Sequence, residues 1–309
     1  MRNRKNVLFI AIFAVLAAAV SLQAVFNYHN SIPVSFVEND GNKETAELQK
    51  RCIKDMNLED EYSVEDISSF SIFYGDVTAD EAPDMVVVIK LDNATFVSVY
   101  YKDGNKYKYI CRLGPFCDVE SVEFRYMENL SKNAVFFREK VNQSLGCFES
   151  DEFIRGYAFI DDILTPVISI TADIETYWND NFSSESSENK WEKITQKSEV
   201  KWISGDCPEI ILTKEQNLFC AKGNSSERIN SDEDFINVDS RIITETYTWS
   251  DKWEKFILGE KVFIPTGETV AVLEDMSSLP YSLAGLDSSR SRILFENGDI
   301  SVVNNKDLK

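Results

Sequence analysis

The stretch IFYGDVTADEAPDMVVVI, residues 72–89, indicates the fold of the chain. It places a strand-forming run, residues 72–74, before an acidic loop and an apolar run, residues 85–89. Short runs of Val, Ile, Phe and Tyr that are bounded by Asp, Gly and Pro are typical of β-strands. The stretch therefore predicts two strands joined by a polar loop.

The same order of elements recurs twice further along the chain. Residues 122–126 lead through a polar loop to residues 134–137, and residues 199–203 lead in the same way to residues 209–212. An aromatic-rich hairpin follows each copy, so each unit contains four strands. Val86 and Val135 occupy matching positions, and their spacing is close to the length of a four-stranded propeller blade.

Four hairpins are predicted from pairs of strand-forming runs that flank short polar turns. The paired runs are residues 95–101 with 106–110, 155–160 with 164–170, 241–249 with 253–258, and 291–295 with 300–303. Residues 42–57 predict one short helix with an apolar face. That face is formed by Leu48, Cys52, Ile53 and Met56.

We therefore predict an all-β fold of antiparallel four-stranded meander repeats, partial or irregular and propeller-like, with one short helix after an N-terminal membrane anchor. The predicted divisions are residues 1–26 (signal peptide or signal anchor), 27–65 (spacer and helix), 66–262 (repeat domain) and 263–309 (a hairpin region of the same domain). Residues 183–190 and 223–239 are polar enough to be exposed loops. The alternative is a pair of β-sandwich-like domains joined near residues 171–190.

Residues 75–88, GDVTADEAPDMVVV, resemble the loop of FG-GAP/VCBS-type repeats, which build β-propellers in secreted bacterial proteins of unassigned function. Asp76, Thr78, Asp80 and Asp84 match the repeat consensus. Ala79 and Glu81 stand where glycines are usual. The resemblance implies an architecture and no activity.

The same loop is the candidate metal site of the sequence. Ca²⁺ takes six or more oxygen ligands, and Asp76, Thr78, Asp80 and Asp84 would supply side-chain oxygens around a tight loop. The loop is not an EF-hand, because Glu81 stands at the glycine position and Val87 at the closing glutamate position. The alternative is an acidic turn between two strands.

The N-terminal 26 residues predict export. Arg2, Arg4 and Lys5 precede a run, residues 7–26, that is apolar except for Ser21 and Gln23. Such a run fits a cleaved signal peptide or an uncleaved helix that spans the membrane. We expect the rest of the chain to lie outside the cytoplasm, anchored by this helix or secreted after cleavage.

Composition excludes several classes of function. The formal net charge of −20 opposes binding to nucleic acids and anionic lipids. The only histidine, His29, directly follows the apolar run. Catalytic triads, Cys-His pairs and His-ligated zinc sites need a histidine within the folded domain, so these chemistries are not expected.

The six cysteines contain no C-x-x-C spacing, so neither a zinc ribbon nor a thioredoxin-type motif is present. Outside the cytoplasm, Cys111–Cys117 and Cys207–Cys220 are the plausible local disulfides. The alternative is that most cysteines are small buried apolar side chains.

All five tryptophans lie within residues 178–253, and the three aromatic residues Tyr247, Trp249 and Trp253 surround one turn. That placement favours cross-strand packing over a sugar-stacking surface. The adjacent carboxylates Asp161-Asp162 and Glu274-Asp275 are interpreted as solvated turns, because neighbouring strand residues point to opposite faces.

These observations favour an extracytoplasmic, non-enzymatic binding or structural module, with a protein or glycan at the cell surface as its partner. The alternative is a glycan-directed hydrolase that uses paired carboxylates. A pocket with two facing carboxylates would favour the hydrolase.

Overall fold

The computed structural model describes residues 31–38, 42–144, 148–161, 163–179, 190–224, 235–286 and 289–309. The chain forms two compact units. The first comprises the chain up to Gly75 together with Glu81–Pro115, and the second comprises Asp76–Asp80 and Phe116–Lys309. The predicted export segment, residues 1–26, and His29 lie outside the described residues. Within the described part of the chain, no helix is long and apolar enough to span a membrane.

The first unit is a five-stranded antiparallel sheet with one long helix. The strand order is β1-β5-β4-β3-β2. The strands are β1 (Ser31–Pro33), β2 (Ile67–Gly75), β3 (Asp84–Leu91), β4 (Thr95–Asp103) and β5 (Lys106–Phe116). A short helix, α2 (Val34–Glu38), follows β1, so part of the predicted spacer is structured.

The long helix of this unit confirms the predicted apolar face. α3 (Asn42–Asp55) buries Leu48, Cys52 and Ile53, and Met56 directly after it is also buried. These side chains pack on the alternate residues of β3 that share one face of the sheet. Helical spacing on one element and strand spacing on the other thus build one core.

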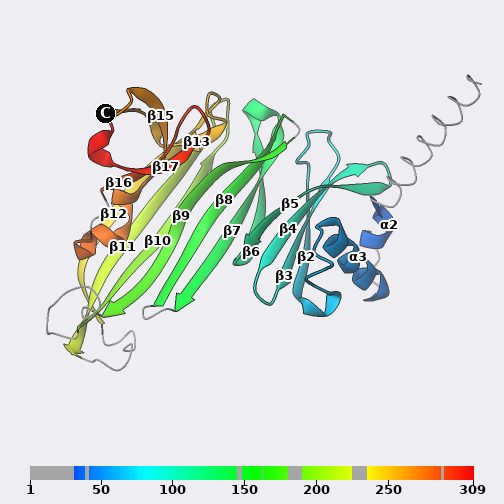
Figure 1. The fold of residues 1–309 in the computed structure, drawn as a ribbon, viewed down its shortest axis with the longest axis horizontal. Helices are drawn as coiled ribbons and strands as arrows, with labels where there is room; N and C mark the ends of the chain where they lie inside the picture. The colour runs from blue at the N-terminus through cyan, green and yellow to red at the C-terminus, as the bar shows by residue number, and fades with distance from the viewer. Residues whose placement is uncertain are drawn as a thin grey trace, which may run out of the picture. The chain divides into compact units, whose positions relative to one another are not determined.

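The second unit contains an eight-stranded antiparallel meander, with the order β13-β12-β11-β10-β9-β8-β7-β6. Figure 1 shows its long central strands side by side. Its strands are β6 (Asp118–Met127), β7 (Lys132–Ser144), β8 (Phe148–Ile160), β9 (Ile163–Asn179), β10 (Lys190–Ile203), β11 (Glu209–Asn224), β12 (Phe235–Ser250) and β13 (Lys255–Ile257).

A four-stranded sheet completes the second unit. It contains β14 (Gly259–Phe263), β15 (Glu268–Asp275), β16 (Arg290–Leu294) and β17 (Ile300–Asn304). The last residues pair with β14, because Val262 and Lys309 exchange backbone hydrogen bonds of 2.9 and 3.0 Å. Residues 276–284, which include the 3₁₀ helices η5 (Met276–Ser278) and η6 (Pro280–Ala284), join β15 to the later strands; we call them the covering segment.

The all-β prediction is confirmed: antiparallel sheets dominate, and all four predicted hairpins form. The three predicted units correspond to β2–β5, β6–β9 and β10–β13. The second and third units share one continuous sheet, whereas each propeller blade is a sheet of its own. Separate propeller blades are therefore not what this part of the chain forms.

Two finer predictions are wrong. β9 and β10 pair directly, from Ile174 opposite Gln196 to Asn179 opposite Trp191, so no domain boundary divides residues 171–190. Residues 235–239 of the second predicted loop belong to β12. Polar side chains suggested a loop there, but one strand face is open to solvent and accepts them.

Candidate functional site

The eight-stranded sheet carries a cavity of about 290 Å³ that is rich in aromatic side chains. We call it the aromatic cavity. Its lining residues are Phe124, Arg125, Tyr126, Met127, Phe136, Trp202, Ile203, Ser204, Pro208 and Phe256. β7 and β10 are separated in the sheet by β8 and β9, yet the rings of Phe136 and Trp202 lie 4.3 Å apart between centroids. The sheet is therefore strongly curled here.

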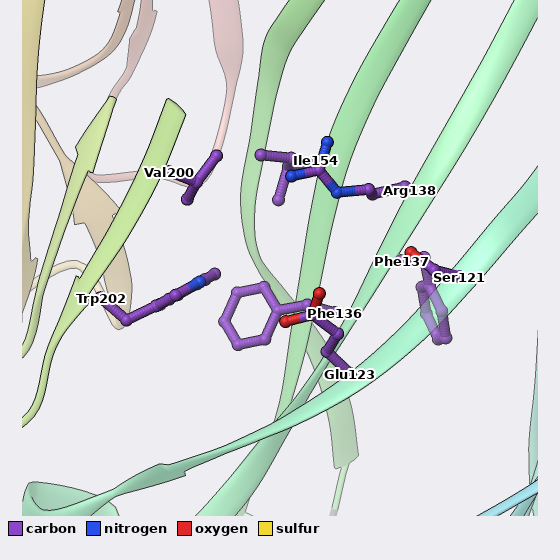
Figure 2. Close-up of a pocket in the computed structure, with 8 residues that line it drawn as sticks. All are labelled: Ser121, Glu123, Phe136, Phe137, Arg138, Ile154, Val200 and Trp202. Carbon is purple, nitrogen blue, oxygen red and sulfur yellow. The ribbon is translucent and has the colours of Figure 1, made fainter. Parts of the chain in front are cut away.

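Trp202 is the central side chain of the cavity. The edge of the Phe136 ring meets it at an interplanar angle of 61°, and the guanidinium carbon of Arg125 lies 5.3 Å from its ring centroid. Figure 2 shows Trp202 and Phe136 pointing toward each other beside a smaller recess of about 20 Å³, which has room for about one water molecule. Glu123, beside this recess, forms an ion pair with Arg125.

Gly156 on β8 makes the position of Phe136 possible. A Cβ atom at residue 156 would lie 2.7 Å from Phe136 Cδ1 and 2.8 Å from Ile168 Cγ2. Both contacts are closer than packed carbon atoms allow. Because residue 156 has no side chain, the Phe136 ring can lie against the backbone of β8 at that position and reach Trp202.

The same face of the sheet carries a buried polar cluster away from the cavity. Lys214 and Gln216 continue the alternation of Ile210 and Leu212 along β11, so all four share one face. Lys214 Nζ lies 2.6 Å from Glu245 Oε2 and 3.1 Å from Ser278 Oγ. The members of this polar cluster are Thr171, Gln196, Lys214, Gln216, Glu245, Tyr247, Glu274 and Ser278.

Amide side chains link the polar cluster to the covering segment. Gln216 Nε2 donates to Gln196 Oε1 and to the Ser278 carbonyl, both at 2.6 Å. Arg241 Nε donates to Gln216 Oε1 at 2.6 Å, and its Nη2 donates to the Leu279 carbonyl at 2.8 Å. The covering segment thus seals this end of the face through its backbone carbonyls.

β15 contributes the remaining carboxylate of the cluster. Thr171 Oγ1 donates to Glu274 Oε1 at 3.0 Å, and Arg292 Nη2 lies 3.4 Å from Glu274 Oε2. Glu274 is buried, so the prediction of a solvated turn at Glu274-Asp275 is wrong for this residue. Asp275 accepts from Ser277 N at 3.0 Å and caps η5.

Burial shifts the ionisation of two groups on this face. Desolvation raises the pKa of Tyr247 well above its ordinary value, and the nearby Glu245 and Glu274 carboxylates add to this. Desolvation, assisted by the charge of Glu149, raises the pKa of Asp151 from 3.8 to about 7. Glu149 in turn accepts a hydrogen bond of 2.9 Å from the Tyr281 hydroxyl of η6.

The residues of the predicted calcium site are distributed over both units. Asp76 Oδ1 accepts from the backbone N–H groups of Ala79 at 2.7 Å and Asp80 at 3.2 Å, which is a local turn. Asp76, Thr78 and Asp80 belong to the second unit, whereas Asp84 begins β3 in the first. Asp84 is buried and accepts from Lys102 N at 3.1 Å.

The calcium prediction stays a prediction from the sequence alone. Among the residues that the structure describes, no three His, Cys, Asp or Glu side chains gather closely enough to hold a metal ion. Ala79 and Glu81, which replace the usual glycines, both adopt positive φ, at 67° and 66°. The loop therefore makes the bends of a glycine-containing loop without the glycines, at a cost in backbone strain.

The predicted disulfides are not formed. Cys111 and Cys207 are thiols, which excludes the pairs Cys111–Cys117 and Cys207–Cys220. Cys52 matches the alternative, because its side chain on α3 is fully buried and desolvation raises its pKa to about 12. Cys147 lies outside the described residues.

Packing is confirmed as the role of most tryptophans. Trp191, Trp249 and Trp253 are all buried, and Trp249 packs edge-on against Phe256 at 5.4 Å between centroids. Trp202 is the exception that lines the aromatic cavity. Asp161 adopts φ 46° in the turn between β8 and β9, as a turn residue should, and Asp162 lies outside the described residues.

Sequence reasoning missed the polar cluster, although one signal was present. Along residues 210–218 the even positions are Ile, Leu, Lys, Gln and Leu, so two polar residues interrupt an otherwise apolar face. Such an interruption in a strand predicts a buried polar contact.

Neither the known protein families nor the curated proteins give a match to this chain.

Proposed function

We propose that the chain is an extracytoplasmic, non-enzymatic binding module that takes a cell-surface protein or glycan in the aromatic cavity. The N-terminal segment, residues 1–26, would tether it to the membrane or be removed on secretion. The observation that carries the proposal is the pairing of Trp202 with Arg125 at the wall of an open cavity. Aromatic faces with a few oriented polar groups are typical of ligand sites.

The ionisable side chains on this face support binding over hydrolysis. A carboxylate-dependent glycosidase needs two carboxyl groups about 5–10 Å apart on either side of its substrate. The described linings of the aromatic cavity and its recess hold one carboxylate, Glu123. Glu245 and Glu274 lie instead in the sealed polar cluster, where they bind Lys214 and Arg292.

The cavity volume limits what the site accommodates. About 290 Å³ is near the lower end of the range for small-molecule sites. It fits one sugar ring or one large side chain of a longer ligand. We therefore propose that the ligand is a chain, of which a single unit enters the cavity.

Binding to immobilised cell-surface glycans and to a panel of extended peptides tests this proposal. We expect Trp202→Ala to abolish binding of a glycan or peptide that the wild type retains, because the stacking surface is lost. Tyr74→Ala is the matched control, since Tyr74 is an exposed aromatic residue of the first unit. Equal binding by the wild type and Trp202→Ala would contradict the proposal.

The hydrolase alternative has its own readout. Release of reducing ends from the same glycans by the wild type, and its loss in Glu123→Gln, would replace the binding proposal with a hydrolytic one. A binding module retains the glycans and leaves them intact.

We also propose that the three four-strand units are related to FG-GAP/VCBS-type repeats. The support is the recurrence of strand, polar loop, strand and hairpin in β2–β5, β6–β9 and β10–β13. The relationship concerns the unit and not the arrangement of blades.

A further inference from the structure

The outer edge of β12 is a long strand edge with apolar side chains exposed beside it. β13 pairs with β12 only at Thr248–Ser250. Elsewhere along β12, no strand in the described part of the chain pairs with this edge. Three large apolar side chains lie in the open part, with exposed fractions of 51% for Ile236, 53% for Val238 and 71% for Ile242.

Natural sheets protect such edges with lysine, proline or repelling charges. β6, the opposite edge of the same sheet, carries four charged residues, Asp118, Glu120, Glu123 and Arg125. β12 contains neither Lys nor Pro over its whole length, FINVDSRIITETYTWS. The charged residues Asp239 and Arg241 near the middle of β12 would therefore determine which strand can pair with this edge.

We propose that β12 pairs with β12 of a second copy of this chain, antiparallel, across a two-fold axis at Ser240. A two-fold axis perpendicular to the sheet leaves each side chain on the same face of the sheet. Odd-numbered residues therefore lie opposite odd-numbered residues of the second copy, and even-numbered residues opposite even-numbered ones. In this register Asp239 faces Arg241 of the second copy, and Val238 faces Ile242. The axis repeats both pairs, which gives two ion pairs between two apolar pairs.

Neighbouring registers are less favourable. An axis at Asp239 sets two aspartates opposite each other, and an axis at Arg241 does the same for two arginines; like charges directly opposite are destabilising. An axis at Ile243 would need Glu245 as the partner of Arg241. Glu245 is buried and already bound to Lys214 at 2.6 Å, so it does not reach a second copy.

Both charged groups already make contacts within the chain. Arg241 Nε and Nη2 donate inward, to Gln216 on β11 and to the Leu279 carbonyl, so its ion pair with the second copy would be made through Nη1. The Ser240 backbone N–H donates to the Asp239 carboxylate at 2.8 Å, a local contact that occupies an edge amide. On pairing, the Asp239 carboxylate would leave the Ser240 amide and bind Arg241 of the second copy. This pairing does not depend on the ligand proposed for the aromatic cavity.

Cysteine cross-linking of the full-length chain tests the register. Residues that face each other across an antiparallel pair have Cα atoms about 4.5–5.5 Å apart, which suits a disulfide. We expect Ser240→Cys to give a disulfide-linked dimer under mild oxidation, well above the wild-type background of the native cysteines. Thr244→Cys is the matched control on the same strand, because its two copies would be about 27 Å apart.

Substitutions that preserve the fold test the charges. Asp239→Arg places two arginines opposite each other, so we expect it to abolish the Ser240→Cys dimer and to give a monomer in light scattering. Ile242→Lys should also weaken the dimer, because it places a charge at the strand edge where an apolar side chain would be paired. Circular dichroism checks that both variants fold.

Three outcomes would overturn the proposal. They are equal cross-linking at Ser240→Cys and Thr244→Cys, an unchanged dimer in Asp239→Arg, and a wild-type chain that stays monomeric at high concentration. The last outcome would leave the edge to an extended peptide of another protein. Loss of ligand binding in Trp202→Ala bears only on the aromatic cavity and leaves this test unaffected.

Discussion

One face of the eight-stranded sheet differs between its two ends in which side chains it covers. Around Trp202 the face is apolar and aromatic, and it opens into a cavity of about 290 Å³. Around Lys214 the face is polar, yet Lys214, Gln196 and Gln216 are completely buried. Tyr126 and Ile203 are exposed and Trp202 is half-buried at one end, while charged and amide groups are covered at the other.

The difference shows that burial in this sheet follows hydrogen bonding as well as hydrophobicity. A buried charge is tolerated only where it is paired, and the covering segment supplies partners to the polar end. The open end needs no such partners, because exposed aromatic side chains leave no buried polar group unpaired. They also offer a contact area to a ligand. Stability should therefore depend on the polar end and binding on the aromatic end.

Lys214→Ala should give the largest loss of stability. It leaves Glu245 buried without its cation, which typically costs about 3–5 kcal/mol. Urea unfolding measures the effect. Lys197→Ala is the control, because the Lys197–Asp173 pair is exposed and should contribute less than about 1 kcal/mol.

A double variant sharpens this prediction. Lys214→Met with Glu245→Leu removes both charges and should recover most of the loss. If Lys214→Ala and Lys197→Ala unfold at the same urea concentration, the polar end is not the stabilising one.

Gly156→Ala should affect both properties through Phe136. The added methyl group collides with the Phe136 ring and Ile168, and overpacking of this kind costs about 1–3 kcal/mol. The displaced ring would also enter the aromatic cavity and weaken ligand binding. Adding Phe136→Leu should restore stability by making room, and non-additive free energies in the double variant would demonstrate the contact.

Asp151→Asn should change the pH dependence of stability. The folded-state pKa of Asp151 is about 7 against an ordinary 3.8, so the folded state binds the extra proton and wild-type stability falls as the pH rises from about 4 to about 7. Asp151 is partly exposed, so we expect the contribution to be about 1–2 kcal/mol.

The asparagine variant should lack this fall and be the more stable protein at pH 8. Thermal melts across pH 4–8 compare the two proteins. Parallel stability profiles would contradict the expectation.

Arg125→Ala should have the smallest effect on stability. Its ion pair with Glu123 is exposed, and its contact with Trp202 contributes about 0.5–1 kcal/mol. Ligand binding should fall severalfold at nearly unchanged unfolding free energy. A large loss of stability would show that the aromatic end also holds the sheet together.

Local sequence signals were sufficient for the helix with its apolar face and for the paired strands of the four predicted hairpins. The helical spacing of Leu48, Cys52 and Ile53 gave α3, and turn residues such as Asn297-Gly298 gave the hairpins. The joining of β9 to β10 could not be predicted, because pairing between units depends on side chains and register more than on each unit's own pattern.

The candidate site was harder to predict because its parts are distant in the chain. Trp202 and Phe136 meet only when the sheet curls, and Lys214 meets Glu245 through strand register. The position of Trp249 and Trp253 around one turn correctly predicted packing for most tryptophans, but it did not distinguish Trp202 from the rest. The burial of Glu274 depends on Thr171, which lies 103 residues earlier.

That long separation has a consequence for how the protein folds. Strands β9–β12 precede the covering segment in the chain, so a half-formed sheet presents Lys214, Gln216 and Glu245 to water until residues 276–284 arrive. A wet, charged surface would keep such a partly formed sheet from associating with other sheets, the usual hazard of slow β-sheet folding with distant contacts. We therefore expect the residues of the polar cluster to oppose aggregation before the chain is folded.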